Sequence, residues 1–585
     1  MGKTMGKQRN GWASSLLILA AVFPLGRVAR GDDAFSKHVA VSQEGHASDV
    51  GREVLRRGGN AIDAAIATAF ALAVTLPEAG NLGGGGFIVA YLADLREIVT
   101  VDFREMAPQS SSPGMYLDKD GKLKARHRAG AWAAGVPGTV RGLGLAHARF
   151  GKTPWSELVL PAVRLARGGF PISADLASSL NRQLASANAG ERNAPRGGDH
   201  GRLGDFSESV AAFGKPDRTP WRAGDRLIQR DLAETLNRIA EIGPDEFYTG
   251  RTAELIANYM ERNSGFVSKN DLSSYQAKLR PPVHTSFRGF EVYSIGPSSA
   301  GGIVLCQMLN ILERFDLKKD GRDSPQTLHR ITEAMRRAFY TRATMLADPE
   351  FLAIPIDELT SKAYAAKLAG SIGDKATPSV ALANFPIEPA ESDHTTHLST
   401  IDQAGNAVSL TYTLEESYGA KCVVAGTGFL LNNEMGDFNL IPGRTDTAGR
   451  IGTPANQIAP HKRMISSQTP TLVLKDGRAR VITGSPGGRT IPNTTLWIVL
   501  NLVEFGLGPR EAVLAPRTHH QWFPDVLTLE GRSWADPTLL ELTAMGHKLR
   551  TIEHQGNANT IVVDPDGRLH GIADPRRSTT KASGD

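Results

Sequence analysis

A hairpin pattern about two-thirds of the way along the chain constrains its fold most strongly. The run His397–Ile401 alternates in the manner of a strand, residues 403–406 supply a turn, and a second such run ends at Thr413. Two alternating runs around a short turn predict a β-hairpin whose first strand begins at Thr395 and Thr396. Antiparallel pairing about this turn brings Thr395 and Thr413 close to one another.

Thr395 gains a chemical role only if it becomes the start of a chain. If the peptide bond after His394 is cut, the hydroxyl and the new α-amino group belong to one residue, which is the nucleophile-and-base arrangement of N-terminal threonine catalysis. A second hydroxyl at Thr413 can hydrogen-bond the nucleophile and hold its rotamer. Threonine is also common in strands, so the spacing alone leaves a purely structural role open.

Composition is that of a large globular protein. The 585 residues are 41% hydrophobic and 22% charged, and no stripe of Lys and Arg interleaved with aromatics accompanies the small net charge of +5. We therefore expect no nucleic-acid partner. Cys306 and Cys422 each lie in an apolar run, which predicts two separate buried or free thiols. His394 and His397 lack an obvious third ligand, so no metal site is predicted.

The N-terminus has the pattern of a secretory signal. Basic residues precede an apolar stretch from Trp12 to Leu25, and Ala29 and Gly31 are small residues suited to cleavage. At about 14 residues, the stretch is shorter than the ~20 needed to span a bilayer, so a cleaved signal is favoured over an uncleaved anchor. We expect residues 1–31 to be a signal peptide, no stable membrane span, and a periplasmic or secreted protein.

Hydrophobic periodicity predicts a mixture of helices and strands. The expected helices lie at 47–57, 61–76, 227–260, 327–346 and 494–505, and the expected strands at 87–91, 98–103 and 479–483. Three prolines in residues 376–391 predict an exposed linker that ends just before Thr395. Strands that frame long helical blocks favour a mixed layered fold over a bundle or an all-β sandwich.

A glycine-rich turn, Gly484–Gly488, lies between the last expected strand and the last expected helix. Such a unit presents backbone N–H groups at a helix N-terminus, where they favour a phosphate or a tetrahedral oxyanion. No Lys-Ser/Thr pair follows, so the phosphate-loop interpretation fails. An ordinary tight turn is the alternative.

Other polar residues are candidates for holding a charged substrate. Arg104 follows a strand and is able to clamp a carboxylate in a cleft, or else to form an exposed salt bridge with Glu105 or Asp102. Ser466 and Ser467 add two adjacent hydroxyls. The loop around Glu434 and Asp437 suits an ammonium or another cation, although such clusters also occur simply on surfaces.

The chain resembles the γ-glutamyltranspeptidase (glutathione hydrolase) family, which belongs to the N-terminal nucleophile hydrolases. The resemblance runs from roughly residue 36 to residue 570 and rests on the ordered motifs PEAGNLGGGGF, DFREMAP, GVPGTV, GPSSAGG, HTTHLSTID, GNAVSLTYT, GFLLNNEMGDF, ISSQTPTLV and GSPGG. Each motif alone is weak, whereas the ordered set is highly specific.

The resemblance implies a role for each candidate residue. Thr395 is the nucleophile and the first residue of a small subunit, and Thr413 is the threonine that hydrogen-bonds it. The substrate α-carboxylate is held by Arg104, Ser466 and Ser467. The α-ammonium is held by Glu415, Glu434 and Asp437, and the backbone N–H groups of Gly487 and Gly488 form the oxyanion hole. No cofactor or metal is required.

The resemblance also implies the architecture and the activity. The expected fold is a four-layer αββα sandwich of the α+β class, made as one precursor and cut between His394 and Thr395. After the signal peptide, residues 32–394 form a large subunit and residues 395–585 a small catalytic subunit, packed as a heterodimer. The implied activity cleaves the γ-glutamyl amide of glutathione and related compounds, and passes the γ-glutamyl group to water or to an acceptor amino acid or peptide.

Two departures from the family pattern concern the site. Many relatives carry Asn and Gln where this chain has Glu415 and Glu434, and both residue types accept hydrogen bonds from an ammonium. Residues 442–460 match a lid loop in length, but Ala448 falls where a tyrosine is expected at its tip. We therefore expect α-amino recognition with a looser lid.

Two alternative functions remain. One is an acylase of the same superfamily that removes glutaryl groups or similar cephalosporin side chains. Glutaryl lacks an ammonium, so the acidic pair Glu434 and Asp437 favours a γ-glutamyl substrate. The other is an uncleaved, non-catalytic periplasmic protein that binds amino acids, which the presence of both Thr395 and Thr413 argues against.

Overall fold

The computed structural model describes residues 34–185, 201–383, 395–447, 449–531 and 534–585. The expected signal peptide and His394 lie outside these residues. Within the described ranges, no helix is both long and apolar enough to cross a bilayer. Cys306 and Cys422 are buried free thiols, as predicted.

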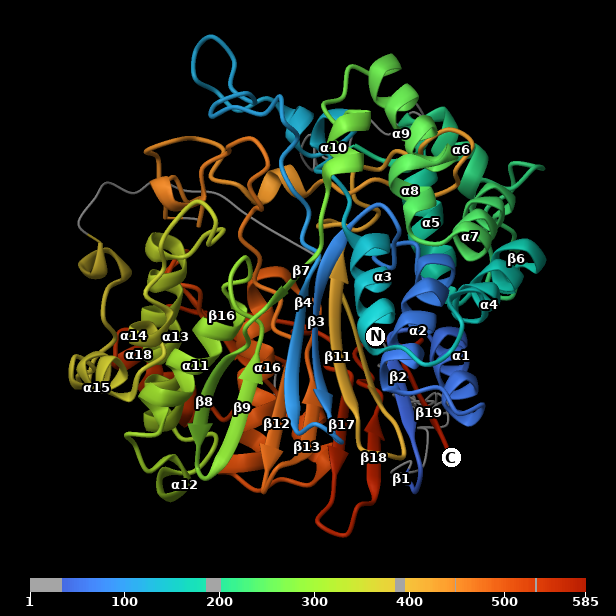
Figure 1. The fold of residues 1–585 in the computed structure, drawn as a ribbon. Coiled ribbons are helices and arrows are strands. Elements are labelled where there is room, and N and C mark those ends of the chain that lie inside the picture. Colours follow the sequence, from blue (N-terminus) through green and yellow to red (C-terminus); the bar gives the residue numbers. More distant parts are fainter. Residues whose placement is uncertain (1–33, 186–200, 384–394, 448, 532–533) are drawn as a thin grey trace, which may run out of the picture.

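Two seven-stranded sheets form the centre of the described fold (Figure 1). The first has the order β19 (Lys581–Gly584), β2 (Val39–Ser42), β10 (Thr396–Ile401), β11 (Ala407–Thr413), β3 (Gly85–Leu92), β4 (Glu97–Asp102) and β7 (Lys278–Arg280). The second has the order β1 (Ala34–Phe35), β18 (Leu569–Ile572), β17 (Thr560–Val563), β13 (Arg478–Thr483), β12 (Thr471–Lys475), β9 (Phe290–Ser294) and β8 (Val283–Phe287). Neighbouring strands in both sheets are antiparallel.

Apolar side chains from the two sheets meet between them. This inner core includes Val41, Phe87, Val89, Leu472 and Ile482, none of which has exposed surface. Because side chains alternate between the two faces of a strand, each sheet also presents an outer face, and that face is covered by helices.

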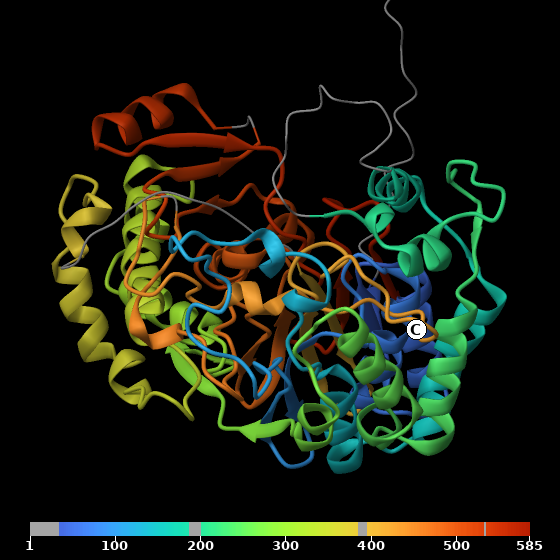
Figure 2. The same ribbon diagram turned by 90° about the horizontal axis from the view of Figure 1, so that it is seen from above.

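The two helical layers lie on opposite sides of the paired sheets, as the views in Figures 1 and 2 agree. On the side of the first sheet are α1 (Gly45–Arg56), α2 (Ala61–Thr75), α3 (Thr139–Phe150), α4 (Trp155–Gly168), α5 (Ala174–Leu184), α6 (Ser207–Phe213), α7 (Arg230–Ile242), α8 (Asp245–Thr249), α9 (Arg251–Arg262) and α10 (Lys269–Ser274). On the side of the second are α11 (Gly301–Leu312), α12 (Leu317–Asp320), α13 (Pro325–Met345), α14 (Ile356–Leu359), α15 (Lys362–Gly370), α16 (Ile491–Val499), α17 (Pro509–Leu514) and α18 (Asp536–Ala544). The expected four-layer αββα sandwich is confirmed.

Two smaller sheets lie outside the sandwich. Three strands, β14 (Thr518–His519), β15 (Leu527–Glu530) and β16 (Leu549–Ile552), form one of them, and β5 (Phe170–Pro171) pairs with β6 (Arg226–Leu227) in the other.

The predicted helices form, with differences that have local causes. Helix α2 begins as expected because Asn60 and Asp63 form a reciprocal capping box at its start. The long stretch expected at 227–260 is divided into α7, α8 and α9, and Gly243 ends α7 with φ at +98°. Helix α16 begins earlier than expected, since Pro492 suits a first helical turn, and continues into the π-helical turn Leu500–Glu504.

Residues 376–383, in the segment predicted to be an exposed linker, are exposed or half-buried except for Ser379. Ser379 in this segment has no exposed surface. Its hydroxyl donates to the Trp522 carbonyl at 2.6 Å and accepts from Arg336 Nη1 at 2.6 Å. These buried partners, which are distant in sequence, hold the segment against the body of the protein. Residues 384–391 lie outside the described part of the chain.

The predicted hairpin is confirmed and occupies the middle of the first sheet. Strands β10 and β11 pair from Thr396 opposite Tyr412 to Ile401 opposite Ala407. The hairpin is flanked by β2 on one side and by β3 on the other. Extending its register by one residue places Thr395 opposite Thr413.

The hairpin is locked to the second sheet by a close contact at Gly484. A Cβ atom on Gly484 would lie 2.5 Å from His397 Cε1. The His397 ring has little room to move, because it is fully buried and hydrogen-bonds Thr411 Oγ1 at 2.9 Å and Ser399 Oγ at 3.1 Å.

We expect Gly484→Ala to lower the free energy of unfolding by about 1–3 kcal/mol, the usual cost of overpacking a tight interior. Urea unfolding of the two proteins measures this difference. Gly168→Ala is the matched control, because a Cβ at that exposed helical position meets nothing within 4 Å. Equal stability losses in both variants would contradict the prediction.

Candidate active site

One pocket brings together the site residues predicted from distant parts of the chain. The residues that line it include Arg104, Thr395, Thr413, Glu415, Glu434, Asp437, Ser466, Ser467 and Gly488. Gly487 precedes Gly488 but is not itself among the lining residues, and His394 lies outside the described chain. Strand ends and loops of both sheets meet at this place, so the pocket forms only when the whole sandwich is assembled.

The two threonines lie at the open end of the central hairpin. Thr395 is partly exposed and immediately precedes β10, whereas Thr413 is 2% exposed at the end of β11. The Thr413 hydroxyl accepts a hydrogen bond from the Glu415 backbone N–H at 2.8 Å. Since a hydroxyl can accept and donate at once, accepting this bond does not prevent the Thr413 hydroxyl from donating to another oxygen.

The glycine turn has the geometry of an anion site. Gly487 and Gly488 have φ values of +126° and +54°, a region that suits glycine. A Cβ on Gly487 would lie 2.4 Å from Thr490 Oγ1. The turn leads into a 3₁₀ turn and then α16. N–H groups at such a start have no partner within the helix and attract negative charge.

Arg104 is buried and surrounded by acids, which rules out the exposed salt bridge considered from sequence. It is 1% exposed. Its Nη2 lies 2.7 Å from Glu434 Oε2 and also contacts Asp437 Oδ2, and its Nη1 lies 3.4 Å from Glu105 Oε2. Three carboxylates therefore share one guanidinium.

Burial of this cluster perturbs the pKa values of the acids. Burial raises the pKa of Glu434 well above its ordinary value and raises that of Glu105 to about 7, while the charge of Arg104 opposes both shifts. When all three carboxylates are ionised, the cluster carries excess negative charge. A cation that enters the pocket relieves this excess, so the cluster favours a positively charged ligand group.

The serines are held rigidly beside this cluster. Ser466 N–H donates to the Ser298 carbonyl at 3.0 Å, and Ser466 Oγ accepts from the Gln468 backbone N–H at 3.1 Å. Ser467 Oγ accepts from Arg342 Nε at 2.9 Å. The hydroxyl hydrogens and the second cation favour an anionic ligand group next to the acids.

Two residues of this site, Arg342 and Glu105, are not predicted as site residues from the sequence. Arg342 lies in the middle of an ordinary helical pattern on α13, and nothing in that pattern distinguishes it. Glu105 adjoins Arg104, and the sequence suggests it only as a surface ion-pair partner of that arginine. Only the packing of α13 and of the segment after β4 against the pocket reveals them.

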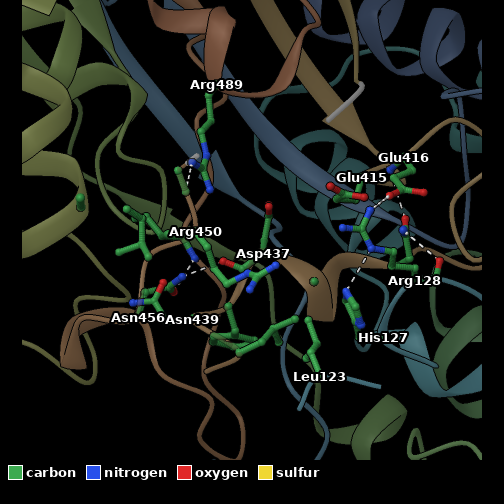
Figure 3. A pocket seen from close by; sticks show the side chains of 18 of the residues that line it. Leu123, His127, Arg128, Glu415, Glu416, Asp437, Asn439, Arg450, Asn456 and Arg489 are labelled. Atoms are coloured by element: carbon green, nitrogen blue, oxygen red, sulfur yellow. Dashed lines mark hydrogen bonds and ion pairs between the residues drawn. The ribbon is translucent and has the colours of Figure 1, made fainter. Parts of the chain in front are cut away.

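A wider chamber opens beside the pocket and shares Arg342, Glu415, Asp437 and Arg489 with it. Figure 3 shows arginines from different segments around it, among them Arg489 and Arg450. Arg489 Nη1 donates to the Gly449 carbonyl. This bond joins the segment expected to be a lid to the residue that follows the glycine pair. Ala448 itself is outside the described residues.

One group of possible metal ligands occurs among the described residues, away from this pocket. Ligand atoms of His329, Glu333 and His547 lie within 4.8 Å of one another. His329 Nδ1 is hydrogen-bonded to His547 Nε2 at 2.9 Å and its Nε2 to the Gly373 carbonyl at 2.8 Å. Glu333 binds Arg336 and Arg337. These mutual contacts use the ligand atoms, so the group is better explained as a structural network.

The buried acids give the stability of the protein a defined pH dependence. Glu105 has a pKa of about 7 when folded, against an ordinary value of 4.5. A raised pKa means that this group's contribution to stability is fully present below about pH 4.5 and is lost as the pH rises to about 7. The unfolded chain ionises first, while the folded chain holds the neutral acid.

We expect Glu105→Gln to remove that loss, which amounts to about 3 kcal/mol at most. The melting temperature of the variant should therefore rise relative to wild type between about pH 5 and pH 8, as followed by calorimetry. Glu553→Gln, at a side chain that is 91% exposed, should leave the profile unchanged. Parallel profiles of Glu105→Gln and wild type would refute this account.

The comparisons with known proteins agree with this geometry. The chain is 42% identical over 540 residues to the glutathione hydrolase proenzyme of Escherichia coli K12, covering 92% of this chain and 90% of that protein. It is 36% identical over 546 residues to the acylase ACY 1 proenzyme of Pseudomonas sp. SE83, with 92% of each covered. The crystal structure of cephalosporin acylase from Bacillus halodurans has the same fold, with a TM-score of 0.82 at 24% identity, covering 97% of this chain and 99% of that one. A sequence model of the family described as Gamma-glutamyltranspeptidase matches residues 47–584, and the chain therefore belongs to that family.

Proposed function

We propose that this protein is a self-processing γ-glutamyl hydrolase and transferase that acts on glutathione and related γ-glutamyl compounds. The observation that carries the proposal is the convergence in one pocket of Thr395 and Thr413 with a buried arginine shared by acids. A nucleophile thus lies beside a site built for a group that carries both a positive and a negative charge. The name of the relative in Escherichia coli supports the same substrate class.

The α-carbon of a γ-glutamyl group carries such a pair of charges. Its carboxylate is held by Arg104 and by the hydroxyls of Ser466 and Ser467. Hydrogen bonds from a guanidinium to a carboxylate are charge-assisted and often bidentate, which makes them strong. Its ammonium is held by three acids around the same place, Glu415, Glu434 and Asp437. Binding replaces ion pairs within the protein by equivalent pairs to the ligand, so the buried charges stay matched.

Processing precedes catalysis in this proposal. Thr395 Oγ attacks the carbonyl carbon of His394, the bond from that carbon to the Thr395 nitrogen breaks, and the nitrogen takes up the hydroxyl proton. Water then hydrolyses the ester, which leaves a carboxylate on His394 and a free amine and hydroxyl on Thr395. The names of relatives as proenzymes support such a step.

The freed amine is then the general base for its own hydroxyl, directly or through water. Thr395 Oγ attacks the γ-carbonyl of the substrate, and the Gly487 and Gly488 N–H groups stabilise the oxyanion by about 3 kcal/mol per donor. The leaving amine takes the proton and departs. Water, or the amine of an acceptor amino acid or peptide, then attacks the γ-glutamyl ester and restores Thr395.

We also propose a two-subunit assembly and a location outside the cytoplasm. Residues 32–394 and 395–585 stay together as a heterodimer, because each central sheet contains strands from both segments. Residues 1–31 are a signal peptide that directs the protein to the periplasm or the exterior. The chemistry requires no cofactor.

Substitution of the nucleophile tests processing and catalysis together. We expect Thr395→Ala to remain a single chain of precursor mass and to lose all measurable hydrolysis of a γ-glutamyl anilide, because no hydroxyl is present to attack. Intact-mass measurement and a denaturing gel follow the cut. Thr395→Ser, which keeps a hydroxyl, should still be cut. The mechanism would be refuted if the Thr395→Ala chain splits into two fragments, or if the wild type is fully active while uncut.

A comparison of γ-glutamyl and glutaryl substrates, together with a substitution in the acidic pair Glu434 and Asp437, distinguishes the proposed function from the acylase alternative. Wild type should prefer a γ-glutamyl anilide over the glutaryl analogue by about tenfold or more in kcat/KM, since a hydrogen bond to a charged group contributes roughly 1.5–3 kcal/mol. Asp437→Asn should narrow this preference by weakening the γ-glutamyl reaction. Equal turnover of both anilides by wild type would favour the acylase. Glu553→Gln, on the surface, serves as the control.

A further inference from the structure

A buried amide lines the pocket beside the two serines. Gln468 is 2% exposed and lines the same cavity as Thr395 and Arg104. Among the described residues, neither Nε2 nor Oε1 of this side chain has a hydrogen-bond partner. Gln468 takes no part in the catalytic steps proposed for Thr395.

The backbone around this amide is firmly held, which makes its position a property of the fold. The Gln468 carbonyl accepts from Ser299 Oγ at 2.7 Å, and its N–H donates to Ser466 Oγ at 3.1 Å. A Cβ on the neighbouring Gly301 would lie 2.4 Å from the same carbonyl. These contacts fix the backbone position from which the Gln468 side chain extends.

An unpaired buried amide is costly, because its donors and its acceptor have given up water without replacement. A ligand that enters the cavity offsets this cost if it offers both a hydrogen-bond acceptor and a hydrogen-bond donor to the amide. The amide carries two N–H donors and one carbonyl acceptor. A carboxylate satisfies the donors and an ammonium satisfies the acceptor, and both lie on the α-carbon of an amino acid.

We propose that the side-chain amide of Gln468 is a further ligand of the substrate, donating from Nε2 to the α-carboxylate and accepting at Oε1 from the α-ammonium. The inference rests on the proposed function and adds a specificity-determining residue to it. Gln468 thereby selects amino-acid heads over simple carboxylates, because a carboxylate alone uses only half of the amide.

The test uses the processed protein and two probes, L-glutamate and glutarate, which differ only in the ammonium. Gln468→Met preserves length and removes both hydrogen-bonding functions. We expect it to weaken L-glutamate binding by about tenfold or more and glutarate binding by less, as measured by calorimetric titration. On a γ-glutamyl anilide, KM should rise by a similar factor while kcat changes by less than about threefold, since the amide does not touch the reacting carbonyl.

The melting temperature of the ligand-free variant is a second readout. If Gln468 had only a structural role, Gln468→Met would lower this temperature. Removing an unpaired buried amide should leave the melting temperature unchanged or raise it. Gln468→Glu keeps the acceptor but places a negative charge beside the carboxylate site, so it should weaken L-glutamate binding more than Gln468→Met does.

Two outcomes would overturn the inference. One is unchanged L-glutamate affinity in Gln468→Met. The other is a lowered melting temperature of that variant together with equal losses for L-glutamate and glutarate, which would mean that the amide supports the fold. A wild type without γ-glutamyl hydrolysis would instead refute the proposed function, so the two failures are distinguishable.

Discussion

The pairing of strands from both sides of residue 395 is the constraint on which the rest of the structure depends. Strand β10 lies between β2 and β11, and β11 pairs with β3, so segments that precede and follow Thr395 alternate within one sheet. The second sheet is likewise built from both segments. Central antiparallel strands have their backbone groups satisfied on both edges, so Thr395 begins in a position that the whole sheet defines. A cut before it would release no strand, because each segment is held by hydrogen bonds to the other.

The buried guanidinium of Arg104 adds an electrostatic constraint to this scaffold. Arg104 and Glu105 come from the end of the β4 segment, whereas Glu434 and Asp437 come from a loop beyond the hairpin. Charges removed from water must be paired, so these segments stabilise each other only when both are folded. Because the carboxylates outnumber the single arginine, the charges of this cluster do not balance when no ligand is bound. That imbalance gives it affinity for a ligand with a positive group, and Arg342 with the serines supplies the complementary half.

Sequence patterns predicted local structure and the most distinctive site residues, and they failed where distant contacts decide. The hairpin, the glycine turn and helices α1, α2 and α13 follow from periodicity and turn chemistry. Three prolines in residues 376–391 predict an exposed linker, yet Ser379 within it is buried against Arg336 and Trp522. Arg342 and Gln468 carried no signal, because a helical arginine and a glutamine after two serines look ordinary until their neighbours are known.

The sequence by itself determined the hairpin at Thr395, the glycine turn and, through its ordered motifs, the family to which the chain belongs. These properties depend on neighbouring residues, whose spacing is visible along the chain. Only the tertiary structure decided that Arg104 is shared by three carboxylates, that Arg342 holds Ser467 and that Gln468, which lines the cavity, has a buried and unpaired amide. Burial and charge pairing depend on which distant segments pack together, and this information is absent from any local pattern.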